Sequence, residues 1–168
     1  MQALKIIGAC ILAAIGYGIV HDQITARICV EYFSVFHPPI LGGTQSPTLL
    51  AFGWGVIATW WVGVLLGVPL AVVARAGSWP RLTVSDLLPM IRTLLIVMAV
   101  CAILAGIAGY FRGVVPPDMR RVIEPELHRR FLADWWAHSA SYASGFLGGI
   151  VLWILAFWKR LSASRCQP

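Results

Sequence analysis

Side chains that can bind a metal ion or exchange a proton are concentrated in two short stretches of the 168-residue sequence. All four histidines and six of the seven acidic residues lie within residues 21–37 and 118–138. Imidazole and carboxylate groups are common ligands of zinc, copper and iron in proteins. The sequence therefore predicts a candidate metal site, and its candidate ligands are His21, Glu31, His128, Asp134 and His138.

The spacing of these residues limits how such a site could be built. Asp134 and His138 are four residues apart, so they would share one face of a helix. The sequence contains no HExxH motif and no run of three ligands. A transition-metal or haem site would therefore have to combine the two stretches, with His21, His128 and His138 as its core.

Two other interpretations of the same residues remain open. A small membrane enzyme could use His21 with Glu31, or His138 with Asp134, as acid and base. The sequence has no GxSxG motif and no phosphate-binding glycine loop, and this disfavours an enzyme. The other interpretation is a set of interfacial ion pairs that hold the polar segments at the lipid headgroups: Arg27 with Glu31, and Arg130 with Glu126.

The elements that must position these residues are membrane-spanning helices. Hydrophobic residues make up 59% of the sequence, charged residues 12%, and the mean hydropathy is +0.80. This composition excludes an intrinsically disordered chain and leaves too few polar residues to cover a water-soluble domain. A helix needs about 20 apolar residues to cross about 30 Å of hydrocarbon. The sequence predicts one all-α domain over residues 1–168, a four-helix transmembrane bundle with spans at about 4–21, 48–74, 90–111 and 139–158.

Local signals mark where some of these helices begin and end. Ser46 followed by Pro47 is typical of an N-cap and a first helical turn, and Thr83 and Asp86 have the spacing of a capping box. The first span is short, because only 15 uncharged residues lie between the first lysine and His21. We therefore expect His21 and the residue after it to lie at the headgroup boundary.

The polar stretches between the spans, residues 22–47 and 112–138, are predicted to lie outside the membrane. Residues 24–36 carry polar side chains on one helical face and apolar ones on the other, which predicts a short amphipathic helix at the interface. The sequence His37-Pro38-Pro39 would end it. Pro125 suits the first turn of a second such helix, which runs on into the fourth span. Four spans would place both polar stretches on the same side of the membrane.

The distribution of basic residues predicts the orientation. The termini and the loop over residues 75–92 carry 7 of the 13 Lys and Arg residues with a single acid, Asp86, whereas the other side carries 6 that are matched by acids. The positive-inside rule then favours a bacterial cytoplasmic (inner) membrane with both termini in the cytoplasm. This orientation accounts for the net charge of +6, and no basic stripe interleaved with aromatic residues indicates nucleic-acid binding.

Small residues recur at fourfold spacing in the second span and predict close helix packing there. Gly63 and Gly67 could pack within one bundle or form a homodimer face, and the sequence leaves both open. Trp60 and Trp61, near the middle of the same span, would either pack against apolar groups or stack on a pigment, quinone or lipid. Four widely spaced cysteines indicate neither a zinc ribbon nor a disulfide framework: Cys10, Cys29, Cys101 and Cys166.

These observations favour a non-enzymatic accessory or interaction subunit whose polar extracytoplasmic face meets the lipid bilayer or a partner membrane protein. The rival hypothesis is a metal- or haem-binding membrane protein that uses His21, His128 and His138, with Glu31 and Asp134 as supporting ligands. A small membrane enzyme with the same groups as acid and base is the third hypothesis. Convergence of three or more of these side chains would favour the metal site over the interaction subunit.

Overall fold

A computed structural model of the chain describes residues 1–112 and 114–165. Every regular element in this part is helical, as the sequence predicts. Four helical stretches are long and apolar enough to cross a membrane: Gln2–Ile28, Pro47–Arg75, Val84–Arg112 and Pro125–Arg165. The elements in chain order are α1 (Gln2–Ile28), α2 (Val30–Val35), α3 (Pro47–Ile57), α4 (Trp60–Arg75), α5 (Val84–Arg112), α6 (Pro117–Arg120), η1 (Pro125–Leu127) and α7 (His128–Arg165).

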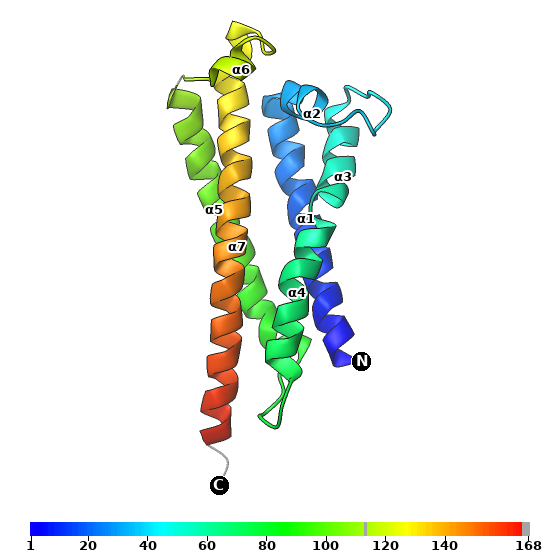
Figure 1. Cartoon of the computed structure of the whole chain (residues 1–168), viewed down its shortest axis with the longest axis vertical. Helices are drawn as coiled ribbons and strands as arrows, with labels where there is room; N and C mark the ends of the chain where they lie inside the picture. The colour runs from blue at the N-terminus through cyan, green and yellow to red at the C-terminus, as the bar shows by residue number, and fades with distance from the viewer. Residues whose placement is uncertain (113, 166–168) are drawn as a thin grey trace.

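The helices form two hairpins that lie side by side. In the first hairpin α1 packs along α3 and α4, and in the second α5 packs along α7. Contacts of α1 with α5 and α7 are much sparser. The start of α1 and the end of α7 lie at one end of the molecule, the termini end, whereas α2 and α6 lie at the opposite end (Figure 1). We call that opposite end the α2/α6 end.

Glycines allow close packing within the first hairpin. A Cβ atom added to Gly63 would lie 2.5 Å from Cα of Ile11, and one added to Gly67 would lie 2.9 Å from Cβ of Cys10. Small residues let two helix backbones approach and gain dispersion contacts. Gly63 and Gly67 are therefore covered by α1 of the same chain, which is the first of the two predicted roles, while homodimerisation stays a prediction.

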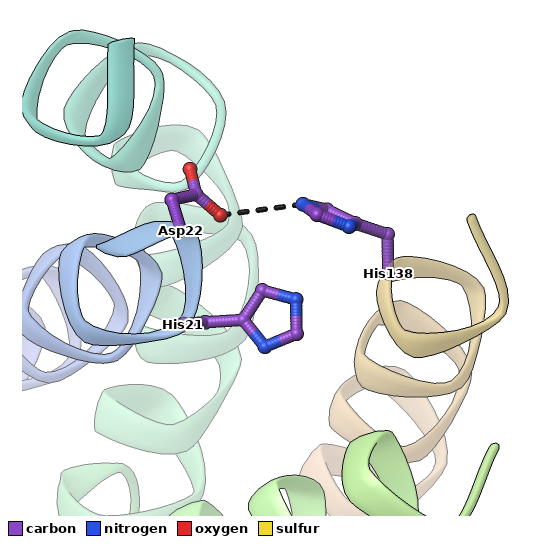
Figure 2. A group of neighbouring side chains, drawn as sticks. All are labelled: His21, Asp22 and His138. Carbon is purple, nitrogen blue, oxygen red and sulfur yellow. Dashed lines mark hydrogen bonds and ion pairs between the residues drawn. The ribbon is translucent and has the colours of Figure 1, made fainter. Parts of the chain in front are cut away.

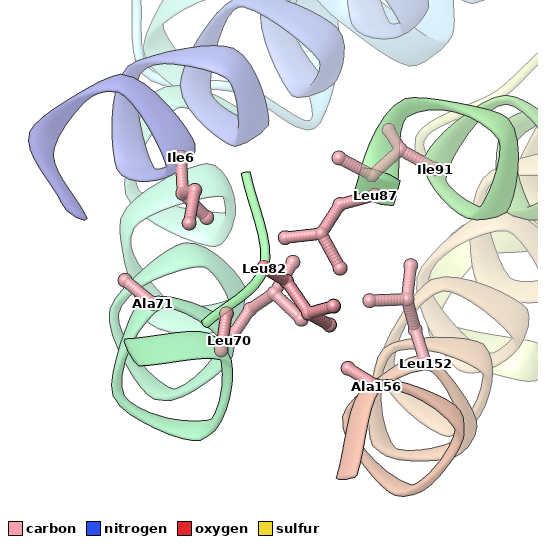
Figure 3. Close-up of a cluster of buried hydrophobic side chains, with 9 residues drawn as sticks. Ile6, Leu70, Ala71, Leu82, Leu87, Ile91, Leu152 and Ala156 are labelled. Atoms are coloured by element: carbon pink, nitrogen blue, oxygen red, sulfur yellow. The ribbon is translucent and has the colours of Figure 1, made fainter. Parts of the chain in front are cut away.

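A cluster of buried apolar side chains joins the two hairpins at the termini end. It draws on α1, α4, α5 and α7 and on the loop between α4 and α5 (Figure 3). Its members are Ile6, Leu70, Ala71, Ala74, Leu82, Leu87, Ile91, Leu152 and Ala156. A smaller cluster of Cys29, Ile123 and Phe131 connects the hairpins at the α2/α6 end. Buried apolar side chains therefore connect the two hairpins at both ends of the bundle.

Arg160 reinforces the termini end. Arg160 is only 3% exposed, and its side chain donates hydrogen bonds to four backbone carbonyl oxygens in the last turn of α4 and the α4–α5 connection. The acceptors belong to Val73, Ala76, Trp79 and Pro80. The last carbonyl groups of a helix have no partner within it. Arg160 therefore caps α4 with a group supplied by α7.

The predicted helix starts are confirmed. The backbone N–H of Leu49 donates to Oγ of Ser46 over 3.5 Å, and the backbone N–H of Thr83 donates to Oδ2 of Asp86 over 2.8 Å. The second predicted span corresponds to the helical stretch Pro47–Arg75, which a break at Ala58 and Thr59 divides into two helices. There the Thr59 hydroxyl donates to the carbonyl oxygen of Gly55. Such back-bonding bends helices and accounts for the division into α3 and α4.

The helices also extend beyond the predicted spans. α1 continues to Ile28 and α7 begins at His128, so much of the stretches 22–47 and 112–138 is helix continuous with the apolar segments. The helix predicted over residues 24–36 is divided at Cys29, whose backbone is extended, into the end of α1 and the short α2. Hydropathy does not identify these extensions, because they carry polar side chains, of which Asp22, Asp134 and His138 are buried between the hairpins. Cys166 lies outside the described residues.

Candidate metal centre

Three potential ligands converge between the two hairpins. His21 and Asp22 come from α1 and His138 comes from α7, and one ligand atom of each lies within 4.8 Å of the others (Figure 2). Asp22 is 5% exposed and His138 is 9% exposed, so the group is shielded from solvent. We call these three residues the His/Asp cluster. It forms because both helices continue past the predicted ends of their spans.

The distance between His138 and Asp22 suits a shared ion. Nε2 of His138 lies 3.3 Å from Oδ1 of Asp22. Two atoms bound to one zinc ion at tetrahedral geometry, each at about 2.05 Å, are about 3.3 Å apart. The pair is thus already spaced as two ligands of a tetrahedral centre.

Asp134 determines which nitrogen of His138 is available. Nδ1 of His138 lies 2.7 Å from Oδ1 of Asp134 and 3.0 Å from the backbone carbonyl oxygen of the same residue. Because both neighbours are acceptors, Nδ1 carries a hydrogen, and Nε2 is left to face Asp22. A carboxylate behind a histidine is the usual second-shell arrangement of metal-bound imidazole, since it orients the ring and increases its basicity.

The same geometry favours a positive charge at or next to His138. With a hydrogen on Nδ1, a neutral His138 would turn the Nε2 lone pair toward the oxygen of Asp22, and the two would repel. Asp134 is fully buried, its Oδ1 atom lies 2.7 Å from Nδ1 of His138, and its Oδ2 atom has no hydrogen-bond partner among the described residues. Buried carboxylates are costly unless they are paired. Either a proton on Nε2 or a metal ion between the ligands removes this penalty.

His21 offers the third ligand atom. Its Nε2 atom is buried and has no hydrogen-bond partner within the described part of the chain. The ring points toward His138 (Figure 2), and the two ring centroids are 4.6 Å apart in a T-shaped contact. An unpaired buried nitrogen is unusual and calls for an unseen partner. Metal coordination would satisfy it after a small movement of the ring toward His138.

A hydrogen bond one turn away from the cluster holds its two helices in register. The hydroxyl groups of Tyr17 on α1 and Ser141 on α7 are 2.8 Å apart. Tyr17 precedes His21 by four residues, and Ser141 follows His138 by three, so the bond lies directly next to the cluster along both helices. It compensates in part for the sparse packing between α1 and α7.

An aromatic shell covers the cluster. The ring of Tyr32 stacks on His138 with centroids 4.6 Å apart, Phe33 meets His138 edge-on, and His37 contacts Trp54 with centroids 4.4 Å apart. Burial lowers the pKa of His37 and raises the pKa of the Tyr32 hydroxyl. The shell is therefore uncharged at neutral pH and provides the low dielectric in which charge interactions are strong.

The predicted ligands have different positions. His21 and His138 meet in the cluster, and Asp134 lies behind His138. Glu31 instead accepts a hydrogen bond from the thiol of Cys29. Burial raises the pKa of this thiol to about 12. Nε2 of His128 lies 3.0 Å from the carbonyl oxygen of Ile123, away from the cluster.

Asp22 is the ligand that the predicted set lacked. Adjacent helical residues point about 100° apart, so His21 and Asp22 share a site only because His138 comes in between them from another helix. The sequence carries one signal of this, an aspartate next to a histidine within a helix that continues beyond both. The pairing of α1 with α7, which brings His138 to them, has no local signature.

The predicted interfacial ion pairs do not form. Arg27 donates to Oε1 of Gln23 over 2.6 Å and to Oγ1 of Thr48 over 2.8 Å rather than to Glu31. Both Glu126 and Arg130 are exposed. Across residues 1–112 and 114–165, the acidic partners in ion pairs are Asp22 and Asp134 with His138, and Asp86 with Lys159.

No protein-family model matches the chain, and no curated protein or solved structure is detectably similar to it. The residues of the cluster and their geometry therefore carry the functional inference.

Proposed function

We propose that this protein is an integral membrane protein that binds one divalent transition metal ion between its two hairpins. The observation that carries the proposal is the buried convergence of His21, Asp22 and His138, with ligand atoms within 4.8 Å of one another. Two imidazoles and one carboxylate are the donor set of many catalytic zinc sites and of non-haem iron(II) sites, which keep a coordination position open. Zinc and iron(II) are therefore the first metals to test.

Placement in a bilayer is part of the proposal. Large apolar side chains on the outside of the bundle are exposed to the surroundings, including Leu104 at 63%, Leu147 at 66% and Phe111 at 76%. An apolar surface of this kind suits lipid contact. The basic residues at the termini end favour cytoplasmic termini in a bacterial inner membrane. The α2/α6 end, which is nearer to the cluster, would then face the periplasm.

The burial of the cluster favours a metal site over a face for partner contact. Asp22, Asp134 and His138 are at most 9% exposed, so a partner protein could not reach them. An interaction subunit would instead present the exposed charged residues of segment 117–130 to its partner membrane protein. A haem is also disfavoured, because the cavity at the cluster measures about 130 Å³, well below the roughly 300–1,000 Å³ of pockets for drug-sized ligands.

Metal analysis of the purified 168-residue chain tests the proposal. We expect about one zinc or iron per chain after mild purification in detergent, measured by inductively coupled plasma mass spectrometry. Titration with Co²⁺ should give visible ligand-field absorption bands. His21→Ala, Asp22→Asn and His138→Ala should each weaken metal binding at least about tenfold, because each removes one of three ligands.

His128→Ala and Glu31→Gln are matched controls, since both residues come from the same polar stretches and lie outside the cluster. They should bind metal as the unaltered chain does. Absence of stoichiometric metal, or equal loss in ligand and control variants, would overturn the proposal. In that case the second candidate function would be acid–base chemistry, carried out by the buried residues Asp22, His138 and Asp134, which are in contact with one another through His138.

Asp134→Asn separates positioning from ligation. Asp134 touches His138 and is not itself among the converging ligands, so we expect metal to remain bound about 10–100-fold more weakly. The Co²⁺ spectrum should keep the same band positions, because the ligands are unchanged. A shifted spectrum would identify Asp134 as a direct ligand instead.

A further inference from the structure

A narrow cavity runs between the two hairpins from the His/Asp cluster to the buried apolar residues at the termini end, including Leu70, Ile91 and Leu152. It measures about 130 Å³. At one end its wall contains the cluster together with Tyr32, Phe33 and Trp54. Along the rest of its length the wall is mainly apolar, with Val62, Leu66 and Met98 as typical members.

A second hollow lies on the outside of the bundle, where α1 faces α5 and α7. This groove measures about 470 Å³ and is lined almost entirely by apolar side chains, among them Val20, Ile24 and Ile103. Each of these three is at least 60% exposed. In the proposed bilayer the groove would open directly to lipid. Tyr17 and His21 line both hollows, so the groove and the cavity adjoin at these two side chains.

The chemistry of the two linings restricts what can bind. Neither hollow is lined by a lysine or arginine from the described part of the chain, so an anionic phosphate head would lack a cation to neutralise it. The buried imidazoles suit instead an uncharged head with oxygen atoms that form hydrogen bonds. The aromatic wall at the cluster suits a flat ring, since aromatic groups stack favourably.

The volumes divide such a ligand into two parts. A cavity of about 150 Å³ with apolar walls holds one benzene molecule. The cavity of about 130 Å³ therefore has at most the volume of a single six-membered ring, which would lie at its aromatic end, and the groove of about 470 Å³ has room for a hydrocarbon tail. The passage at Tyr17 and His21 would join the two parts.

We propose that the bundle binds an isoprenoid quinone, with the ring in the cavity beside His21 and His138 and the tail in the groove between α1 and α5. The buried Nε2 atom of His21, which has no partner among the described residues, supplies a hydrogen-bonding group for a ring oxygen. If an ion fills the cluster, its open coordination position takes that role. The inference rests on the proposed bilayer placement and does not require the metal.

Binding of decylubiquinone to the 168-residue chain in lipid nanodiscs tests this inference. Bound quinone is extracted and quantified after removal of free ligand, with empty nanodiscs as the blank. We expect saturable binding of one molecule per chain in excess over the blank. n-Decanol, which has the tail without the ring, should not compete. No saturable binding, or competition by decanol at equal concentration, would overturn the inference.

Substitutions on α1 locate the site. Ala14 lines the cavity two helical turns before His21, so Ala14→Leu should reduce the cavity volume next to the ring position and weaken binding at least about tenfold. Gly16→Leu is the matched control, because a Cβ atom at Gly16 meets nothing within 4 Å, and binding should be unchanged. Ala58→Leu fills the cavity from the α3–α4 break and replaces Ala14→Leu if that variant does not fold. Equal effects of Gly16→Leu and the cavity variants would contradict the proposed location.

Metal content is measured on the same samples, after chelation and after zinc loading. Quinone binding without metal would support this inference and contradict the metal proposal, whereas metal binding without quinone would do the reverse. Each of the two proposals can therefore be contradicted while the other is supported.

Discussion

At the scale of single residues, the chemistry of the site depends on how His138 is held. One ring nitrogen faces Asp134 and the other faces Asp22, at 2.7 Å and 3.3 Å respectively. A histidine between two carboxyl groups needs either a proton or an ion to balance the charge. Because the ring is also stacked on Tyr32, its orientation is set before any ligand arrives. Such preorganisation lowers the cost of binding.

The pKa of His37 makes the stability of the shell depend on pH. Burial lowers this pKa below its ordinary value of 6.5, so the folded state favours the neutral ring. The resulting stability is fully present above pH 6.5 and is lost as pH falls from there toward the lowered pKa. We expect the melting temperature to fall between pH 7.5 and pH 5.5 under metal-free conditions. His37→Gln, which cannot become charged, should show a smaller fall.

Circular dichroism of the two proteins at both pH values provides the measurement. His128→Gln is a control, because this histidine lies away from the cluster. An equal pH dependence in the chain with and without His37 would show that this residue does not contribute.

Contacts between residues close together in the sequence could be predicted best. The pairing of Asp134 with His138 follows from a four-residue spacing within one helix. The participation of Asp22 could not be derived, because it depends on the position of α7 relative to α1, more than one hundred residues away along the chain. A sequence does not distinguish polar residues on the outside of the bundle from polar residues inside it, so the burial of Asp22 and Asp134 could not be predicted.

At the scale of the helices, the connection between α4 and α5 is held by Arg160. A guanidinium group presents five N–H donors in a fixed planar arrangement, which allows one side chain to satisfy several carbonyl groups. Lysine has a single ammonium group and cannot reproduce this geometry. The starts of α3 and α5 could be predicted because their capping residues lie next to them in the sequence. The cap on the end of α4 could not be predicted, because Arg160 belongs to a helix that is distant in the sequence.

Arg160→Met should destabilise the bundle by about 2–5 kcal/mol, because it leaves several carbonyl oxygens without their donor. This corresponds to a decrease of about 5–15 °C in the melting temperature. Arg160→Lys should recover only part of the loss. Arg165→Met is the control, since Arg165 is exposed on the same helix. Equal melting temperatures of the Arg160 and Arg165 variants would contradict a structural role for Arg160.

At the scale of the whole molecule, the two hairpins are joined by apolar clusters at their ends and by the His/Asp cluster between α1 and α7. The four-helix architecture could be predicted from hydropathy alone. The division into two hairpins could not, because it depends on side-chain shape along each helix, such as the close contact of Gly63 with Ile11. A ligand that bridges α1 and α7 therefore strengthens the weaker of the two kinds of interface.

Metal binding should consequently stabilise the complete chain. Free ion at one hundred times its dissociation constant adds about 2.7 kcal/mol to the free energy of unfolding. In a chain of this size the melting temperature should rise by about 5–10 °C on addition of zinc to chelated protein. His138→Ala should abolish the rise, and His128→Ala should retain it. A rise of equal size in both variants would mean that zinc binds elsewhere.

The separation of the ligands along the chain also determines when the site can exist. His21 and Asp22 belong to α1 and are translated more than one hundred residues before His138 on α7. If the cluster binds an ion, its three ligands can come together only after α7 has been made and has packed against α1. An ion held there would mark chains in which the two hairpins have docked.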